Sequence, residues 1–253
     1  VTYDNTFIES EWWALKQIWD KGLLYKGFKI VPYCPRCGTP LSSQEVAQGY
    51  KDVKERSAVV KFKAKGEDAY FLAWTTTPWT LPANEAVSVH PELTYDLIET
   101  EKGALILVRE LAEAALKRYG LEGTVVGSCP GLALDQVLLK HPFQNRDVAI
   151  ICGKHVTTEA GTGLVHTAPA HGVDDYNIGK KYGLPVNNPV GNDGKFISTV
   201  PALSVGELAG LSVWQANPLV LQELEAKGRL LKQEKIQHSY PHCWRHKTPI
   251  IFR

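Results

Sequence analysis

The chain contains no methionine, and its charges of opposite sign almost cancel. Its 253 residues include 28 lysines and arginines against 27 aspartates and glutamates, which gives a formal net charge of +1. A balance so close to zero argues against broad, salt-driven binding along a nucleic-acid duplex, while a local contact with the end of a strand stays open. The lack of methionine, even at position 1, suggests a segment excised from a longer protein.

Long apolar runs and a disulfide pattern are missing as well. No apolar run approaches the roughly 18 residues of a membrane span, and the opening residues VTYDNTFIES match neither a signal peptide nor a transit peptide. Five cysteines, an odd number in a chain of this length, do not indicate a disulfide framework. We therefore expect a soluble protein of a reducing, cytoplasmic compartment, with one or two domains and an ample core.

The familiar motifs of nucleotide binding and covalent hydrolysis are absent too. Gly161-Thr162-Gly163 is too short for a phosphate loop and lacks the spacing of a dinucleotide fingerprint. No Gly-x-Ser-x-Gly elbow, no HExxH and no convincing order of Ser, His and Asp occurs. If the chain hydrolyses a substrate, these absences favour a positioned water molecule over a covalent nucleophile.

Short strands dominate the pattern that is present. Strands are predicted at residues 57–65, 69–77, 86–89, 94–100, 104–108, 124–127, 147–152 and 164–167, with a hairpin turn at 66–68. Helices are predicted at 6–21 before Gly22, at 109–119 before Gly120, at 174–182 before Gly183, and from Pro218, capped by Asn217, to about 227. Many short strands, scattered helices and no regular βαβ alternation indicate an α+β fold with a mixed, barrel-like β core and peripheral helices.

The most informative stretch spans residues 74–84 and reads WTTTPWTLPAN. The apolar strand before it should stop at Pro78, whose nitrogen cannot donate to a sheet ladder. The strand mouth then presents four neutral hydroxyls, which suit ribose and ester oxygens better than phosphate, on Thr75, Thr76, Thr77 and Thr80. The alternative is purely structural, namely a β-branched strand end followed by a proline turn.

Two pairs of metal-ligating residues lie near opposite ends of the chain. Cys34 and Cys37 form one pair, and Cys243 and His246 form the other, each with two residues between the ligands. Together they predict a closed, structural zinc site of the Cys3His type, which would bring the two ends of the chain together as in a domain inserted into a host. A redox pair, unligated cysteines, or His242 in place of His246 stay open as alternatives. The remaining cysteines are expected in the core, and they are Cys129 and Cys152.

A second constellation, residues 159–176, reads EAGTGLVHTAPAHGVDDY. Asp174 is expected to cap a helix, whereas Asp175, one position further in, could point its carboxylate into a pocket and attract a substrate ammonium group. His166 follows an apolar strand and is expected to line the same pocket. His171 is open between a general base, a metal ligand and a satisfied polar side chain.

Four segments of the chain resemble the class I isoleucyl-tRNA synthetases. They read DNTFIESEWWALKQIWDKGLLYKG, WTTTPWTLPAN with AVSVHPELTYD, GTGLVHTAPAHGVDDY, and HSYPHCWRHKTPIIFR. The related valyl and leucyl enzymes carry an arginine after the threonine pair, where this chain continues with Thr77-Pro78-Trp79. The signatures HIGH and KMSKS are absent. The chain therefore looks like the inserted editing domain of that family, connective polypeptide 1, without an ATP site.

The resemblance implies hydrolysis of valine wrongly esterified to isoleucine tRNA. The threonine run would hold the terminal adenosine and the ester, Asp175 would bind the α-ammonium group, and His166 would limit the side chain. The expected catalytic set is Thr75, Thr76, Thr77 and Asp175, and the expected substrate contacts are Trp79, Thr80, Leu81, Asn84, His166 and Ala168. Water, assisted by the free ribose hydroxyl of the tRNA, would attack the ester.

The resemblance also implies a division of the chain and a set of partners. Residues 1–54 and 230–253 would form a zinc-binding, ribbon-like base leading to the absent catalytic domain, and residues 55–229 the editing domain. The expected partners are the 3′ end of tRNA(Ile) carrying valine and the parent catalytic domain, with a monomeric fragment and no membrane. Two other function classes stay open: a non-catalytic, zinc-stabilised module that binds the tRNA 3′ end, and a zinc hydrolase with an open metal position.

Overall fold

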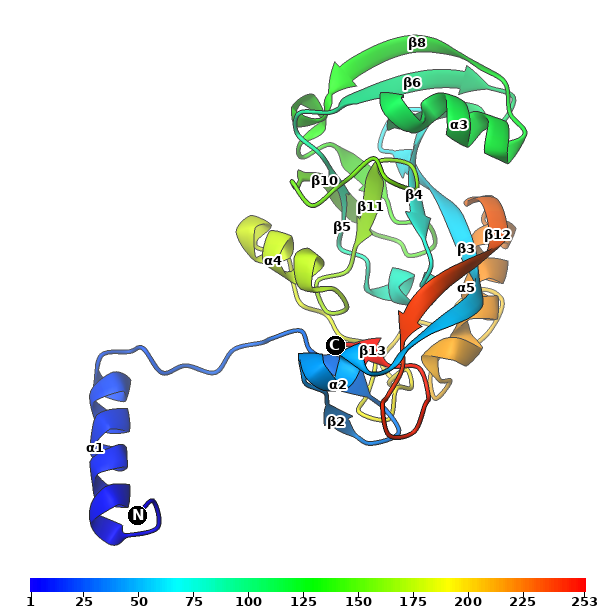
Figure 1. Cartoon of the computed structure of the whole chain (residues 1–253). Coiled ribbons are helices and arrows are strands. Elements are labelled where there is room, and N and C mark those ends of the chain that lie inside the picture. Colours follow the sequence, from blue (N-terminus) through cyan, green and yellow to red (C-terminus); the bar gives the residue numbers. More distant parts are fainter.

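The computed structural model describes all 253 residues and is built around one large mixed sheet (Figure 1). The strand order is β11-β5-β10-β9-β3-β4-β7-β6-β8, and β12 pairs with β3 beside this path. The strands are β3 (Tyr50–Ala64), β4 (Ala69–Thr75), β5 (Ala86–Val89), β6 (Thr94–Thr100), β7 (Gly103–Val108), β8 (Gly123–Pro130), β9 (Leu138–Lys140), β10 (Asp147–Cys152), β11 (Leu164–Thr167) and β12 (Leu230–Pro241). Both parallel and antiparallel pairs occur, so the predicted α+β class with a mixed sheet is confirmed.

The β3–β4 hairpin determines where the threonine run lies. Antiparallel pairing aligns Lys63 with Tyr70 and Ala58 with Thr75, with the predicted turn at 66–68 between the strands. The inner faces of both strands join a core cluster of 37 buried residues. β4 ends at Thr75, and Pro78 begins the short 3₁₀ helix η1 (Pro78–Ala83). A proline is tolerated at the first position of a helix because its missing N–H would have no partner there.

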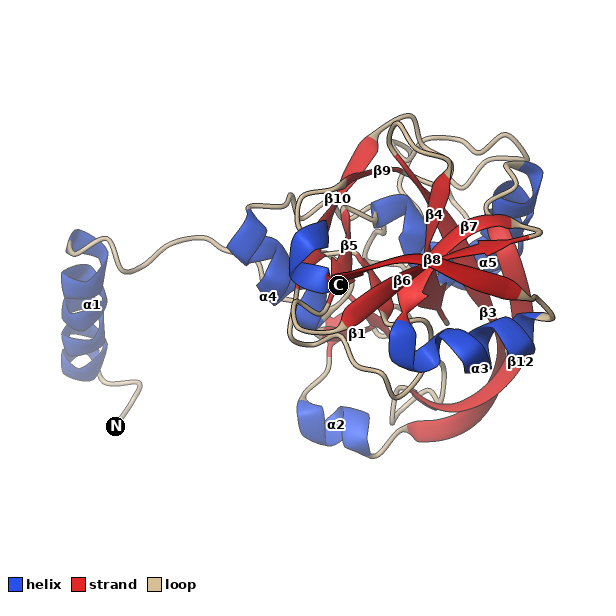
Figure 2. Ribbon diagram, turned by 90° about the horizontal axis from the view of Figure 1, so that it is seen from above, coloured by secondary structure: helices blue, strands red, loops and turns tan.

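Three helices surround the sheet, as Figure 2 shows from above. α3 (Arg109–Tyr119) and α4 (Val173–Tyr182) end at Gly120 and Gly183, both in the left-handed conformation, as predicted. The predicted start of the third helix was wrong. α5 (Val213–Ala226) begins five residues earlier than Pro218, because Ser212 and Gln215 form a reciprocal capping box.

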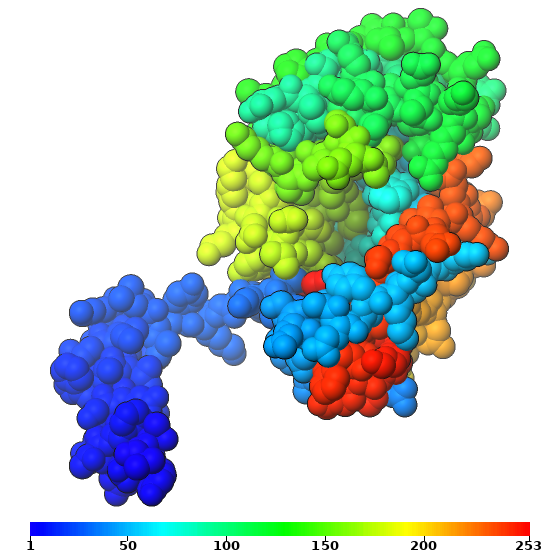
Figure 3. Space-filling model, viewed as in Figure 1, coloured from blue at the N-terminus to red at the C-terminus, as the bar shows by residue number.

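The N-terminal helix α1 (Asn5–Asp20) stands clear of the body, which Figure 3 shows in blue. None of its residues is buried, and Gly22 follows with a φ of +67°. An extended segment joins it to the rest of the chain (Figure 1). None of the helices is long and apolar enough to cross a membrane.

The two ends of the folded body meet in a small base. β1 (Pro32–Cys34) pairs with β13 (Ile251–Phe252) and with β2 (Thr39–Pro40), beside α2 (Ser43–Ala47). This base has a core of its own, separate from the main cluster, made of Cys34, Leu41, Val46, Cys243 and Ile250. The 54/55 position lies inside β3, so an unbroken two-stranded ribbon of β3 and β12 connects the base to the sheet.

Candidate active site

A cavity of about 300 Å³ lies where β4 ends, between β11 and the first turn of α4. The threonine run and Asp175, about 100 positions apart in the printed sequence, line it together. The complete lining is Trp74, Thr75, Thr76, Thr77, Thr80, Val165, His166, Ala168, His171 and Asp175. The structure thus brings the two predicted constellations to one hollow.

The threonine hydroxyls are arranged by the turn that follows β4. The Thr77 N–H donates to Thr75 Oγ1 over 3.1 Å, and the Thr80 hydroxyl donates to the Thr77 carbonyl over 2.8 Å. These contacts hold the turn in place at the mouth of the strand. The hydroxyl of Thr76 makes no hydrogen bond within the chain, so it is free to bind a molecule in the cavity.

His166 is a fixed wall of the cavity. Asn84 Nδ2 lies 2.8 Å from His166 Nδ1, and the same amide nitrogen donates to the Ala86 carbonyl, so Nδ1 must accept. Nε2 therefore carries the proton and donates to Thr80 Oγ1 over 2.8 Å. Burial lowers the pKa of His166 to about 3, which keeps the ring neutral. Both ring nitrogens of His166 form hydrogen bonds within the chain, so neither is free to abstract a proton from a substrate or a water molecule.

Asp175 is the only carboxylate in the cavity lining. The Ala168 N–H donates to its Oδ2 over 2.9 Å, which orients the group. Burial raises the pKa of Asp175 to about 6, partly opposed by that hydrogen bond. No lysine or arginine lines the cavity, and burial also lowers the pKa of His171, to about 4. At pH 7 the cavity therefore holds one uncompensated negative charge, which suits a cationic group of a ligand.

Three of the expected contacts lie behind the cavity wall instead of facing it. Trp79 is buried, makes a T-shaped contact with the His171 ring, and donates its backbone N–H to Asn217 Oδ1. Leu81 is fully buried in the main core, and Asn84 acts through His166. Thr80, His166 and Ala168 do line the cavity. The lining residues not predicted as contacts are Trp74, Val165 and His171, all of which belong to the two singled-out segments.

The loop between β9 and β10 holds η1 in place through hydrogen bonds to its backbone carbonyls, and we call this set of contacts the clamp. His141 Nε2 binds the Leu81 carbonyl over 3.0 Å, and Gln144 Nε2 donates to the Pro82 carbonyl over 3.1 Å. Arg146 donates to the Asn84 carbonyl and pairs with Glu85. This clamp was not apparent in the sequence, because its residues belong to no motif. It fixes the turn that carries Thr80 and Asn84, and so fixes His166.

Three cysteines in the base are close enough to bind one metal ion. The sulfur atoms of Cys34, Cys37 and Cys243 all lie within 4.8 Å of one another, and those of Cys37 and Cys243 are 3.7 Å apart. Tetrahedral zinc with bonds of about 2.3 Å needs sulfurs about 3.8 Å apart, so the set fits that ion. The Cys37 N–H donates to Cys34 Sγ, as in a ligand knuckle. Neither His246 nor His242 joins the group.

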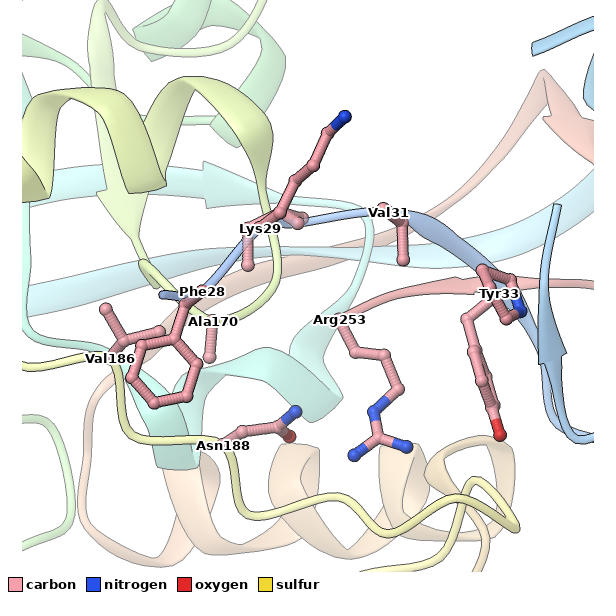
Figure 4. A pocket seen from close by; sticks show the side chains of 10 residues that line it. Phe28, Lys29, Val31, Tyr33, Ala170, Val186, Asn188 and Arg253 are labelled. Carbon is pink, nitrogen blue, oxygen red and sulfur yellow. The ribbon is translucent and has the colours of Figure 1, made fainter. Parts of the chain in front are cut away.

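A larger cavity, of about 400 Å³, lies where the N-terminal segment meets the body (Figure 4). Mostly apolar side chains line it, among them Phe28, Val31 and Val186, and the Arg253 side chain lies between Asn188 and Tyr33. Its lining contains no carboxylate and no serine or threonine hydroxyl. It therefore has no anionic partner for an ammonium group, whereas the smaller cavity offers several hydroxyls and one negative charge.

Comparison with known proteins gives the family. The family model of tRNA synthetases class I (I, L, M and V) matches residues 1–245. The chain belongs to the class I tRNA synthetases. An isoleucine–tRNA ligase of Dechloromonas aromatica is 72% identical over 256 residues, and one of Nitrosomonas europaea is 51% identical over 257 residues. Each match covers 95% of this chain and 27% of the relative, so the chain spans about a quarter of the length of these synthetases.

Two solved structures share the fold. The crystal structure of GlLeuRS-CP1 matches with a TM-score of 0.55 at 15% identity, over 70% of this chain and 99% of that one. The P. knowlesi cytosolic leucyl-tRNA synthetase editing domain matches with a TM-score of 0.53 at 11% identity, over 72% of this chain and 97% of that one. This part of a class I tRNA synthetase therefore has the fold of the CP1 editing domains.

Proposed function

We propose that this chain is the editing part of an isoleucyl-tRNA synthetase and hydrolyses valine from valyl-tRNA(Ile). The observation that carries the proposal is the single cavity shared by the threonine run, His166 and Asp175. Such a step is needed because a synthetic pocket of this family gains only about 1–3 kcal/mol from one extra methylene, an established value for these enzymes. A second, smaller cavity can accept valine and exclude isoleucine.

Each part of the cavity has a role in this reaction. The hydroxyl of Thr76, free of partners in the chain, binds the terminal ribose or the ester, with Thr75 and Thr77 beside it. Asp175 binds the α-ammonium group, which every aminoacyl ester carries. His166, held by Thr80 and Asn84, meets the side chain and sets the size limit.

The attacking group is water, and no covalent intermediate forms. No cysteine, serine or lysine lines the cavity. The one imidazole bonded to a threonine, His166, donates its proton to Thr80, and Thr80 donates its own to a carbonyl, so neither is activated as a nucleophile. A water molecule positioned by the threonines, with the free ribose hydroxyl of the tRNA assisting, is left to attack the ester.

Zinc would hold the base together without taking part in the hydrolysis. Cys34, Cys37 and Cys243 would bind it, and zinc would supply a cross-link between the two ends of the folded body. None of these cysteines lines the cavity between β4 and α4. A structural metal of this kind stabilises the fold outright.

The test is incubation of the chain with valyl-tRNA(Ile) and with isoleucyl-tRNA(Ile), followed by measurement of released amino acid. We expect release of valine well above the rate without protein, and little release of isoleucine. The matched variants are Asp175→Asn, expected to slow valine release by about 10- to 150-fold, and Asp174→Asn, which changes an exposed neighbour outside the cavity and is expected to leave the rate nearly unchanged. Binding of both tRNAs with release of neither amino acid would favour the non-catalytic binding module.

A further inference from the structure

Three cationic side chains surround one tyrosine ring on the β3–β4 hairpin. Lys61 Nζ lies 4.6 Å from the centroid of the Tyr70 ring, Lys63 Nζ 5.8 Å, and Arg229 Cζ 5.4 Å. Arg229 follows α5 and is tied to the hairpin by the Lys61 N–H, which donates to its carbonyl over 2.8 Å. Residues remote in sequence thus converge on Tyr70.

Lys102 is a fourth cation of this cluster, and Asp68 is the one carboxylate that pairs with a member of it. Lys102 precedes Gly103, whose backbone lies so close to the ring that an added Cβ would be 3.4 Å from Tyr70. Burial lowers the pKa of Lys61, and the nearby charges of Arg229 and Lys102 lower it further. Asp68 pairs with Lys63 over 3.0 Å and leaves the other cations without an ion-pair partner.

Such an arrangement favours the binding of an anion. Like charges held close together repel one another, and a cation on an exposed aromatic ring recovers only about 0.5–1 kcal/mol. An anion placed between Lys61, Lys102 and Arg229 would convert this repulsion into attraction. Each of the three cations retains donors for an oxygen ligand, and Arg229 can engage two oxygens at once.

The cluster is connected to the cavity by β4 itself. Side chains alternate along a strand, so Tyr70 and Trp74 project to the same side of β4, and Trp74 lines the cavity. Four residues at about 3.3 Å each place Tyr70 about 13 Å from Trp74. Leu72, between the two rings on this face, is fully buried, so a nucleic-acid strand whose last nucleotide occupies the cavity would pass over the groups that cover Leu72 and bring its next phosphates to the cluster around Tyr70.

We propose that Lys61, Lys102 and Arg229 around Tyr70 bind the phosphodiester backbone of the tRNA strand that delivers the aminoacyl ester. The proposal rests on the proposed function for its choice of anion. It also accounts for a near-neutral protein engaging a strand end, because the contact needs one local cluster and no general excess of positive charge.

The direct test is binding of a labelled single-stranded oligoribonucleotide with the sequence of the tRNA 3′ end, measured by fluorescence anisotropy over a salt series. The double variant K61Q/R229Q removes two charges and is expected to bind more weakly. Its plot of log affinity against log salt should be shallower by about 1.4, so the advantage of the wild type shrinks about sevenfold between about 50 and about 200 mM salt. The variant K61R/R229K retains the charges and should restore most of the affinity.

Lys181→Gln is the matched control, because Lys181 Nζ also lies over a tyrosine ring, 5.4 Å from that of Tyr182, but on α4 and alone. It should bind as the wild type does. Unchanged affinity and salt slope in K61Q/R229Q, or an equal loss in Lys181→Gln, would overturn the phosphate site. Melting temperatures show whether each variant is folded.

A hydrolysis arm separates this proposal from the proposed function. With valyl-tRNA the double variant should raise KM several-fold at an unchanged kcat, whereas valyl-adenosine, which carries no phosphate chain, should show no such difference. If the wild type hydrolyses neither ester, the proposed function fails, while the oligonucleotide titration still decides the phosphate site. An equal defect on both esters would overturn the phosphate role.

Discussion

Replacing Asp175 by asparagine should lower the hydrolytic activity and raise the stability of the fold. Asparagine has the same shape and can still accept the Ala168 N–H through its carbonyl oxygen. It cannot carry the negative charge. The substitution therefore removes the proposed partner of the substrate ammonium group and leaves the local structure intact.

The size of the loss follows from the isolation of this charge. A hydrogen bond to a charged group contributes about 1.5–3 kcal/mol, which corresponds to a reduction of kcat/KM by about 10- to 150-fold. No other carboxylate lines the cavity to take over the role. Asp174→Asn changes the same charge one residue away, where the side chain is exposed, and should alter kcat/KM little.

Stability should move the other way. Burial raises the pKa of Asp175 from 3.8 to about 6, so the folded state holds a proton more tightly than the unfolded chain. Stability is therefore lost as the pH rises from about 4 to about 6, and the loss is complete at pH 7. Asparagine does not ionise, so the variant avoids this loss of stability. Its unfolding free energy at pH 7 should exceed that of the wild type by on the order of 2–3 kcal/mol.

The assay combines single-turnover deacylation of valyl-tRNA(Ile) with urea unfolding, both between pH 5 and 8. Wild-type activity should rise with pH through about 6, as the carboxylate ionises, and the residual activity of Asp175→Asn should lack this step. A variant that retains full activity would refute the ammonium role. A variant that loses both activity and stability would show that Asp175 acts as a structural residue.

Three further predictions concern the wall, the clamp and the base. His166→Ala should let isoleucyl-tRNA be deacylated at a rate approaching that of valyl-tRNA, and continued rejection of the isoleucyl ester would count against the size limit. Arg146→Ala should destabilise the chain by about 2–4 kcal/mol in urea, because the Asn84 carbonyl loses its donor and Glu85 loses its ion pair, keeping only the hydrogen bond from Asn187, and a change below about 0.5 kcal/mol would contradict the clamp. Cys34→Ser should lower bound zinc, measured by metal analysis, and the melting temperature together, whereas Cys129→Ser should change neither. Bound zinc that survives Cys34→Ser would exclude this ligand set.

Helix ends and hairpins could be predicted from the sequence where one residue decides the local conformation. Gly120 and Gly183 end their helices in the left-handed conformation, as a glycine after an apolar periodic segment indicates. Pro218 misled the prediction, since proline more often opens a helix than lies inside one. Here the Ser212–Gln215 capping box determines the start, and the side chain of Asn217 binds the Trp79 N–H instead of capping.

The polar ribbon and the clamp could not be predicted, for a different reason. β12 and the first half of β3 alternate mostly polar residues and bury little, so they lack the hydrophobic pattern of a strand, and only their pairing with each other makes them strands. Arg146 and His141 act on backbone carbonyls of η1, which every residue possesses. Contacts of this kind leave no trace in residue type or spacing.

The most direct test of the shared cavity is a crystal structure of the chain with a non-hydrolysable valyl-adenosine analogue. The ammonium group should lie within hydrogen-bonding distance of the Asp175 carboxylate. The ribose should contact Thr76, and the valyl side chain should face His166. An analogue seated in the apolar cavity beside Phe28, with the hollow between β4 and α4 empty, would contradict it.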